Sequence, residues 1–235
     1  MTTLEINAQT IGFPSFDVLR DVHLTWNQSS NVLIIGANGS GKSTLLKYLL
    51  ALLPKQAGDV IYRGVSVFSK QKESVLAEFG VFFPEYRVYD FLTVRENLEI
   101  FAHYQGVENS DIAQKLQDFH LLDVADVKAK YISLGNYKKV CLAVSLLGNP
   151  KLIVLDEPFL GVDKASIQII LTTLERMRLE NDALVLLTTH ELEPVADWFT
   201  ELVHIKDKSI YRRLTKDELQ ERFGTLSNFQ KEEYA

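Results

Sequence analysis

Residues Val32 to Thr44 read V-L-I-I-G-A-N-G-S-G-K-S-T, an apolar run followed directly by a glycine-rich loop. The loop matches the phosphate-binding pattern G-x-x-x-x-G-K-[ST], placed between a predicted strand and a predicted helix. Its glycines leave room for backbone N–H groups to curve around a triphosphate, and the helix that begins near Lys42 points its positive dipole end at the same phosphates. An ordinary glycine-rich turn is the alternative, but such a turn does not require Lys42 and Ser43 in this register. The stretch therefore predicts a nucleotide site.

The residue types within the loop indicate how a nucleotide is held. Lys42 would reach the β- and γ-phosphates, and the Ser43 hydroxyl would bind Mg²⁺. The Asn-Lys-x-Asp motif that reads guanine does not occur in the chain, which disfavours a GTPase. The predicted nucleotide contacts of the loop are Gly36, Asn38, Gly39, Ser40, Gly41, Lys42, Ser43 and Thr44.

Composition excludes several other classes of protein. The 235 residues carry a net charge of −6, which disfavours broad nucleic-acid binding, so we expect no nucleic-acid partner. The single cysteine, Cys141, excludes an intramolecular disulfide and fits a reducing compartment. The N-terminus lacks a basic segment before an apolar core, and no apolar run approaches the roughly 18 residues that a membrane span needs. We therefore expect neither a signal peptide nor a membrane crossing in this chain.

Apolar periodicity predicts an α/β fold. Continuous apolar runs at 32–35, 152–155 and 183–187 are typical of parallel strands that are buried on both faces. Shorter strands are expected within 4–26 and at 60–62, 65–68 and 79–83, and helices over 42–53, 95–103, 112–122, 137–147, 164–179 and 215–223. Strands that alternate with helices indicate a doubly wound, mainly parallel sheet. The helix-rich block between the loop and the next buried strand is expected to be an inserted subdomain.

Two strand ends carry candidate catalytic residues. Leu152 to Pro158 reads L-I-V-L-D-E-P, which places Asp156 and Glu157 at the sheet edge where ligands bind in open α/β folds. Asp156 is suited to hold Mg²⁺ through water, and Glu157 to orient and polarise an attacking water. His190 follows the next buried strand and is suited to donate to the γ-phosphate. Solvated strand-end side chains are the alternative for all three. The remaining histidines are expected to be structural or on the surface: His23, His103, His120 and His204.

These motifs, in this order, closely resemble the ATP-binding subunits of ABC transporters, over about Leu4 to Phe223. The resemblance implies an α/β fold with a P-loop NTPase core, a mainly parallel sheet, a small N-terminal antiparallel β region and an α-helical subdomain inserted at about 86–149. It implies one ABC ATPase domain over 1–225 and a C-terminal tail over 226–235.

Further residues match the family one position at a time. The segment L-T-V-R-E-N-L, Leu92 to Leu98, matches the start of the helical subdomain. Asp163 matches the aspartate that crosses to the partner subunit, and His190 matches the switch histidine. Phe13 lies where an aromatic ring stacks on adenine, with Phe16 as a weaker candidate and a core aromatic as the alternative for either.

The signature segment departs from the family. In place of L-S-G-G-Q the chain has I-S-L-G-N, which keeps Ser133 and Gly135 and puts Asn136 at the glutamine position. In the family this segment caps the γ-phosphate held by the other subunit, from the start of a helix. The resemblance therefore implies ATP contacts by Ser133, Gly135 and Asn136. Leu134 adds bulk where backbone and phosphate approach closely, which would weaken closure.

Two further charged residues, Glu85 and Lys139, stand at or beside the family's motif positions. Glu85 stands where the family usually has a glutamine that reaches Mg²⁺ and the attacking water, so it is predicted to contact metal together with Ser43 and Asp156. At about 4 Å and an effective dielectric constant of about 20, its charge interacts with a unit charge by about 4 kcal/mol, and the sign depends on whether Mg²⁺ or the γ-phosphate is nearer. Lys139 keeps a positive charge one turn after the signature, with a solvated lysine as the alternative.

The resemblance implies a function. An ABC ATP-binding subunit binds ATP and Mg²⁺, forms a head-to-tail dimer with a second ATP-binding subunit, and powers transport through a separate integral membrane permease. It is cytoplasmic and peripheral on the inner face of the cell membrane. We expect an export-type system, because no added regulatory domain is evident, and either a homodimer or a heterodimer.

Two other functions stay open. One is a soluble ABC ATPase that acts as an assembly or regulatory factor. The other is a nucleotide-bound regulator that scarcely turns over, as Leu134 and Glu85 would allow, although Glu157 and His190 argue against it.

Overall fold

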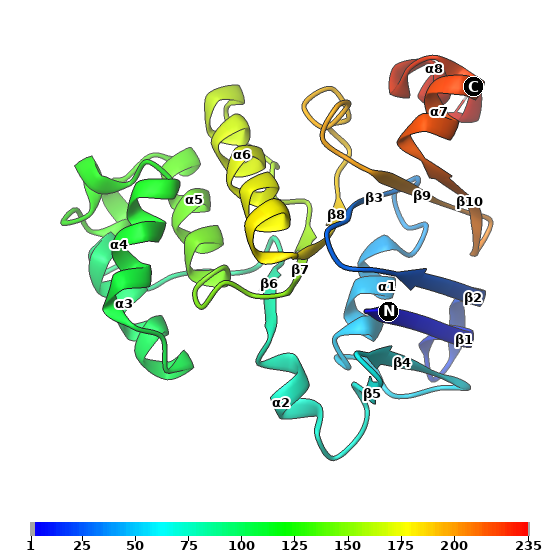
Figure 1. Cartoon of the computed structure of the whole chain (residues 1–235), viewed down its shortest axis with the longest axis horizontal. Coiled ribbons are helices and arrows are strands. Elements are labelled where there is room, and N and C mark those ends of the chain that lie inside the picture. The colour runs from blue at the N-terminus through cyan, green and yellow to red at the C-terminus, as the bar shows by residue number, and fades with distance from the viewer. Residues whose placement is uncertain (1–2, 235) are drawn as a thin grey trace.

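The chain folds into two β-sheets with helices packed between and around them (Figure 1). The computed structural model describes residues 3–234, so Met1, Thr2 and Ala235 lie outside the described part. The first sheet is antiparallel, with the strand order β2-β1-β4-β5. Its strands are β1 (Leu4–Phe13), β2 (Phe16–Trp26), β4 (Gly58–Tyr62) and β5 (Val65–Ser66). This sheet confirms the small N-terminal antiparallel region.

The second sheet carries the phosphate loop and has the order β10-β9-β3-β8-β7-β6. All neighbouring pairs are parallel except β10 with β9, which confirms the mainly parallel sheet. The apolar pattern does not predict β9 and β10, because charged and polar residues interrupt both. The strands are β3 (Asn31–Ile35), β6 (Phe79–Phe82), β7 (Leu152–Asp156), β8 (Leu184–Thr188), β9 (Glu201–Lys206) and β10 (Ser209–Thr215).

The central strands are buried on both faces, as their continuous apolar runs predict. Every residue of β3, β7 and β8 is buried. Alternate residues of β3 face different cores: Val32 and Ile34 pack with the first helix and the antiparallel sheet, whereas Leu33 and Ile35 pack with the helical block. Two cores therefore fix the sheet, and the carboxyl ends of β3, β7 and β8 meet at one rigid edge.

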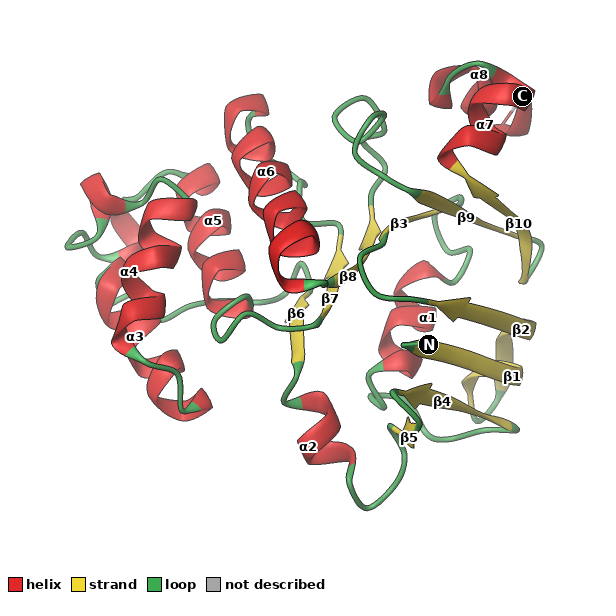
Figure 2. Ribbon diagram, in the orientation of Figure 1, coloured by secondary structure: helices red, strands yellow, loops and turns green. Residues whose placement is uncertain are grey.

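Helices cover both faces of this sheet, and a block of three stands at one end of the molecule (Figure 2). The block confirms the inserted helical subdomain and consists of α3 (Val94–Gln105), α4 (Asn109–Asp118) and α5 (Leu134–Ser145), with short 3₁₀ turns at Leu122–Val124 and Ala129–Tyr131. The other helices are α1 (Lys42–Leu49), α2 (Lys72–Leu76), α6 (Lys164–Asn181), α7 (Lys216–Phe223) and α8 (Leu226–Tyr234).

Some helix limits differ from the predicted ones. Helix α1 ends at Leu49 rather than near Leu53, because Ala51 has a left-handed φ of 52°. Helix α5 begins earlier than predicted, because Ser133 caps it by accepting a hydrogen bond from the N–H of Asn136. Neither α2 nor α8 is predicted, and α8 forms from residues that the domain prediction leaves as a tail. Among the described residues, no helix is both long and apolar enough to cross a bilayer.

Candidate functional site

The phosphate loop links the end of β3 to the start of α1, and two of its glycines are structurally required. Gly36 has a φ of 157°, and a Cβ there would lie 2.5 Å from both Ser40 Oγ and the backbone oxygen of Ile205. Gly41 has a φ of 110° at the N-cap of α1, and its Cβ would lie 2.9 Å from a methyl group of Leu19. The loop can therefore keep its curve only with glycine at these positions.

Lys42 projects from the first turn of α1 back into the loop. Its Nζ donates hydrogen bonds to the backbone oxygens of Gly36 at 2.8 Å and Ala37 at 3.2 Å. Burial lowers the pKa of Lys42, and the nearby carboxylates of Glu157 and Asp156 partly oppose that shift. The buried ammonium lies at the concave side of the loop, where a triphosphate would replace the carbonyl contacts.

A threonine that sequence reasoning missed orders the end of β7. Thr188, the last residue of β8, is fully buried and pairs in register with Asp156. Its Oγ1 donates to Asp156 Oδ1 at 2.6 Å and accepts from the N–H of Glu157 at 3.0 Å. The only sequence signal for this role is its position two residues before His190, at the end of a buried strand.

Glu157 and His190 form a pair beside this threonine. Glu157 Oε2 accepts from the N–H of His190 at 3.1 Å, and Glu157 Oε1 lies 3.1 Å from His190 Nε2. Burial raises the pKa of Glu157, although His190 and Lys42 lower it in part. Glu157 also has a left-handed φ of 46°, a conformation that costs about 1–3 kcal/mol and is typical of functional sites.

Two oxygen donors at this edge fit Mg²⁺. Among the described residues, no group of three or more His, Cys, Asp or Glu side chains could hold a metal. Mg²⁺ at phosphate sites needs only one or two protein oxygens, because substrate phosphates and water supply the rest. The Asp156 carboxylate, oriented by Thr188, and the Ser43 hydroxyl in the first turn of α1 are such donors.

Glu85, the third predicted metal contact, has a different neighbour. Its side chain is 69% exposed, and its Oε1 lies 3.7 Å from Nζ of Lys47 on α1. The carboxylate thus pairs with a lysine one turn beyond Ser43, and Lys47 also lies over the ring of Phe83.

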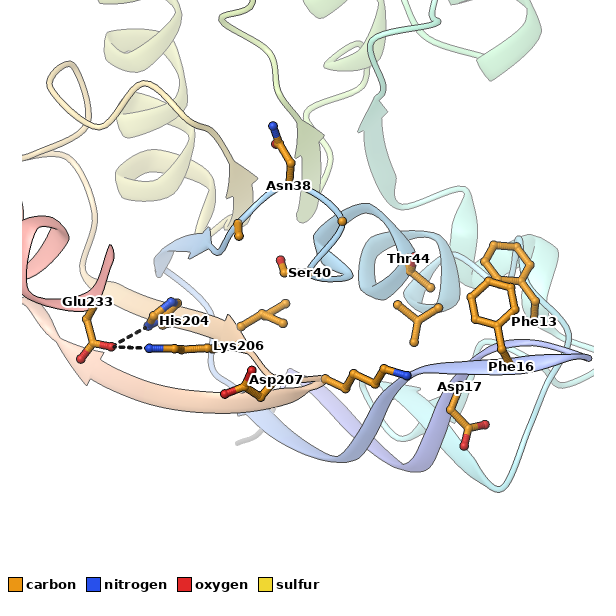
Figure 3. Close-up of a pocket in the computed structure, with 15 residues that line it drawn as sticks. Phe13, Phe16, Asp17, Asn38, Ser40, Thr44, His204, Lys206, Asp207 and Glu233 are labelled. Atoms are coloured by element: carbon orange, nitrogen blue, oxygen red, sulfur yellow. Dashed lines mark ion pairs between the residues drawn. The ribbon is translucent and has the colours of Figure 1, made fainter. Parts of the chain in front are cut away.

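A pocket of about 690 Å³ lies where the adenine base of the nucleotide is predicted to bind (Figure 3). Phe13 and Phe16 line it, 40% and 56% exposed, with ring centroids 5.2 Å apart. Asn38, Ser40 and Thr44 of the phosphate loop line the same pocket. Either phenylalanine is therefore available to stack on a base, and neither is a core aromatic.

The far end of this pocket lies against β9. His204, expected to be structural or on the surface, is buried within β9, which agrees with a structural role, and it also lines the pocket with Lys206 and Glu233. Burial lowers the pKa of His204, and Glu233 opposes that shift. Sequence reasoning missed this wall because it did not predict β9.

The signature segment packs against Asp163, the aspartate that is predicted to cross to the partner subunit. A Cβ on Gly135 would lie 2.6 Å from Asp163 Oδ2. Asp163 caps α6, accepting from the N–H of Ser166 at 2.9 Å and from its Oγ at 2.8 Å, and these bonds lower the pKa of Asp163. Neither Gly135 nor Asp163 lines the pocket beside Phe13 or a smaller pocket of about 340 Å³ between the phosphate loop and His190.

Leu134 and Lys139, within and just after the signature, differ in burial. Leu134 is 56% exposed, and its Cδ2 would lie 3.2 Å from a Cβ on Gly161. Lys139 is only 4% exposed, so the alternative of a solvated lysine is wrong. Burial lowers the pKa of Lys139, and the charge of Asp163 opposes the shift.

Taken together, the loop, the carboxylate pair and the histidine define a P-loop nucleotide hydrolase on an α/β sheet. The model of the ABC transporter family matches residues 19–160. The ABC-type transporter ATP-binding protein EcsA of Bacillus subtilis (strain 168) is 28% identical over 229 residues, or 95% of this chain and 92% of EcsA.

Solved structures agree with this family match. The structure of an ATP-binding subunit of an ABC transporter has a TM-score of 0.87 and 26% identity and covers 100% of both chains. The dimeric post-hydrolysis structure of the ATP-binding cassette MJ0796, bound to ADP and Pi, has a TM-score of 0.80 at 21% identity, over 91% of this chain and 98% of that one, and shares the fold. The chain belongs to the ABC transporter family, as an ATP-binding subunit that hydrolyses ATP.

Proposed function

We propose that this subunit closes head to tail with a second ATP-binding subunit around two ATP molecules and powers a separate membrane permease. The observation that carries the proposal is the separation of two half-sites within one chain. The phosphate loop, Glu157 and His190 meet at one sheet edge, whereas Ser133 caps α5, Gly135 lies in the first turn of that helix, and neither lines the pockets that contain Asn38 of the loop. The dimeric state of the structurally similar MJ0796 cassette supports a dimer.

In this proposal each residue at the loop has a distinct role. Backbone N–H groups of the loop and Lys42 bind the β- and γ-phosphates. The buried Glu157 carboxylate accepts a hydrogen bond from the attacking water and takes its proton, and its raised pKa suits a general base. His190 holds Glu157 and donates toward the γ-phosphate. Ser43 and Asp156 would hold Mg²⁺, which neutralises charge on the phosphate oxygens when bound.

The remaining predicted contacts complete the proposal. Phe13 stacks on adenine, and Ser133, Gly135, Asn136 and Asp163 act toward the nucleotide held by the second subunit. The exposed capping end of α5 supports this, since a helix N-terminus favours an anion. Asp163 lies beside Gly135, so it would approach the nucleotide of the second subunit together with the signature segment.

We propose that the permease lies in the membrane, that this subunit is cytoplasmic on its inner face, and that the system exports its substrate. EcsA, by its name a transporter ATP-binding protein, aligns with almost the whole chain and supports a permease partner. Direction is tested by reconstituting the complex in vesicles with external ATP, which energises outward-facing subunits. Uptake of substrate into such vesicles supports export, and release of preloaded substrate contradicts it.

The head-to-tail arrangement has a sharp biochemical test. Lys42→Ala destroys the loop half-site, and Ser133→Trp blocks the signature half-site, so each variant alone should lose turnover. A mixed dimer contains one site with both halves intact, and mixing the variants should therefore restore ATP hydrolysis. If wild-type chain hydrolyses ATP but the mixture stays inactive while both variants remain folded, the arrangement is wrong.

A further inference from the structure

Helix α8 reaches the nucleotide site from the C-terminal end of the chain. Gln230 lines a pocket of about 340 Å³ together with His190, Gly36 and Asn38. Glu233, one turn later, lines the larger pocket with Ser40 and Phe13 (Figure 3). Both pockets include Ala37 and Asn38, so α8 borders the phosphate loop on two sides.

The contact is anchored by a buried carboxylate. The Glu233 side chain is 4% exposed, and its Oε1 lies 2.8 Å from Arg212 on β10. Its Oε2 lies 3.7 Å from Lys206 and 3.8 Å from Nδ1 of His204, both on β9. A carboxylate this deeply buried is costly to leave unpaired, so Arg212 and Lys206 hold Glu233 in place.

Apolar packing fixes the same helix on its inner face. Phe229 is fully buried and packs edge-on against His204 at 5.6 Å and against Phe223 of α7 at 5.0 Å. Leu226 at the start of the helix is also buried. Gln230 is exposed toward the pocket, so its amide is available to a ligand there.

We propose that α8 is a wall of the ATP site, in which Gln230 contacts the nucleotide on the γ-phosphate side, next to His190, and Glu233 is the positioning residue that holds the helix there. The inference rests on the proposed ATP site at the phosphate loop. A carboxamide can donate to phosphate oxygens without adding charge. The anchoring contacts of Glu233 are all made within the chain, to His204, Lys206 and Arg212.

Two substitutions test the wall through binding. Glu233→Gln removes the charge that pairs with Arg212 and Lys206, and Gln230→Ala removes the amide. Each should raise the KM for ATP about fivefold, or about 1 kcal/mol, with kcat changed by less than about twofold, since the wall contributes to binding alone. Glu232→Gln is the matched control: Glu232 neighbours Glu233, is exposed, and should keep the wild-type KM.

A second readout separates a wall from a purely structural helix. Backbone amides of α8 in the wild-type chain should exchange more slowly with deuterium when ATP is added, and Lys42→Ala should abolish that difference. Wild-type KM in both Glu233→Gln and Gln230→Ala, or α8 exchange that ATP does not change, overturns the inference. If Glu233→Gln fails to fold, Gln230→Ala and the exchange measurement decide. Failure of the wild-type chain to bind ATP would instead refute the proposed function.

Discussion

Thr188 provides the strongest single test of the site geometry, because one hydroxyl bonds both the Asp156 carboxylate and the backbone N–H of Glu157. Thr188→Val keeps the shape of the side chain but removes the bond to Asp156 at 2.6 Å and the bond to the N–H of Glu157 at 3.0 Å. The first bond is to a charged group and is worth about 1.5–3 kcal/mol. The N–H of Glu157 keeps its hydrogen bond to the backbone oxygen of Thr188 at 3.1 Å, so loss of the second bond adds only about 0.5 kcal/mol. The folded state should therefore lose about 2–3.5 kcal/mol.

The effect on turnover follows from the same bonds. If misorientation of Asp156 and Glu157 removes about 2 kcal/mol of transition-state stabilisation, kcat/KM falls about thirtyfold. The Mg²⁺ concentration at half-maximal turnover should rise as well, because Asp156 is then free to rotate. Both quantities are measured by steady-state ATP hydrolysis over a Mg²⁺ titration, at a temperature where the variant is folded.

A matched control separates the site from general destabilisation. Thr173→Val removes a similarly buried hydroxyl, which lies within hydrogen-bond distance of the backbone oxygens of Ile169 in α6 and Asp118 in α4. It should lower the free energy of unfolding and leave turnover and the Mg²⁺ requirement unchanged. Equal loss of stability in the two variants, with wild-type turnover in both, would refute the assigned role of Thr188.

Three further predictions test neighbouring groups. Gly36→Ala should abolish ATP binding by calorimetry, because φ is 157° and the Cβ would lie 2.5 Å from a backbone oxygen; normal affinity would show that the loop tolerates the methyl group. Because burial raises the pKa of Glu157 above its usual 4.5, turnover should fall as pH drops through a midpoint above that value, and a pH–rate profile without this limb would exclude Glu157 as the base. Leu134→Gly should raise ATP-dependent turnover at least about threefold by relieving crowding at closure, or about 0.7 kcal/mol, and unchanged turnover would show that Leu134 does not impede closure.

The sequence predicts the central fold because its signals are local. The loop at Gly36–Thr44 and the continuous apolar runs of β3, β7 and β8 are set by backbone sterics and by burial on both faces, so they can be read from neighbours in the chain. The pairing of Glu157 with His190 follows from the same logic, since both sit at adjacent strand ends.

What the sequence does not predict depends on distant contacts. Strands β9 and β10 carry charged residues whose partners lie elsewhere, such as Arg213 with Glu201 and Arg212 with Glu233. Helix α8 has little apolar pattern of its own, and its order comes from burying Phe229 against His204 and Phe223. Glu85 also shows this limit, because its pairing with Lys47 depends on the placement of α1 beside the end of β6.

We propose that this subunit works on a membrane partner in its ATP-bound, closed state. Glu157→Gln, loaded with ATP and Mg²⁺, should hold that state, and it can be used to capture partners from gently solubilised native membranes. The expected result is recovery of a multi-spanning membrane protein that is lost when ATP is omitted or when Lys42→Ala is added. Recovery of soluble partners alone, or of none, under conditions in which the variant binds ATP, would contradict it and favour a soluble assembly or regulatory factor.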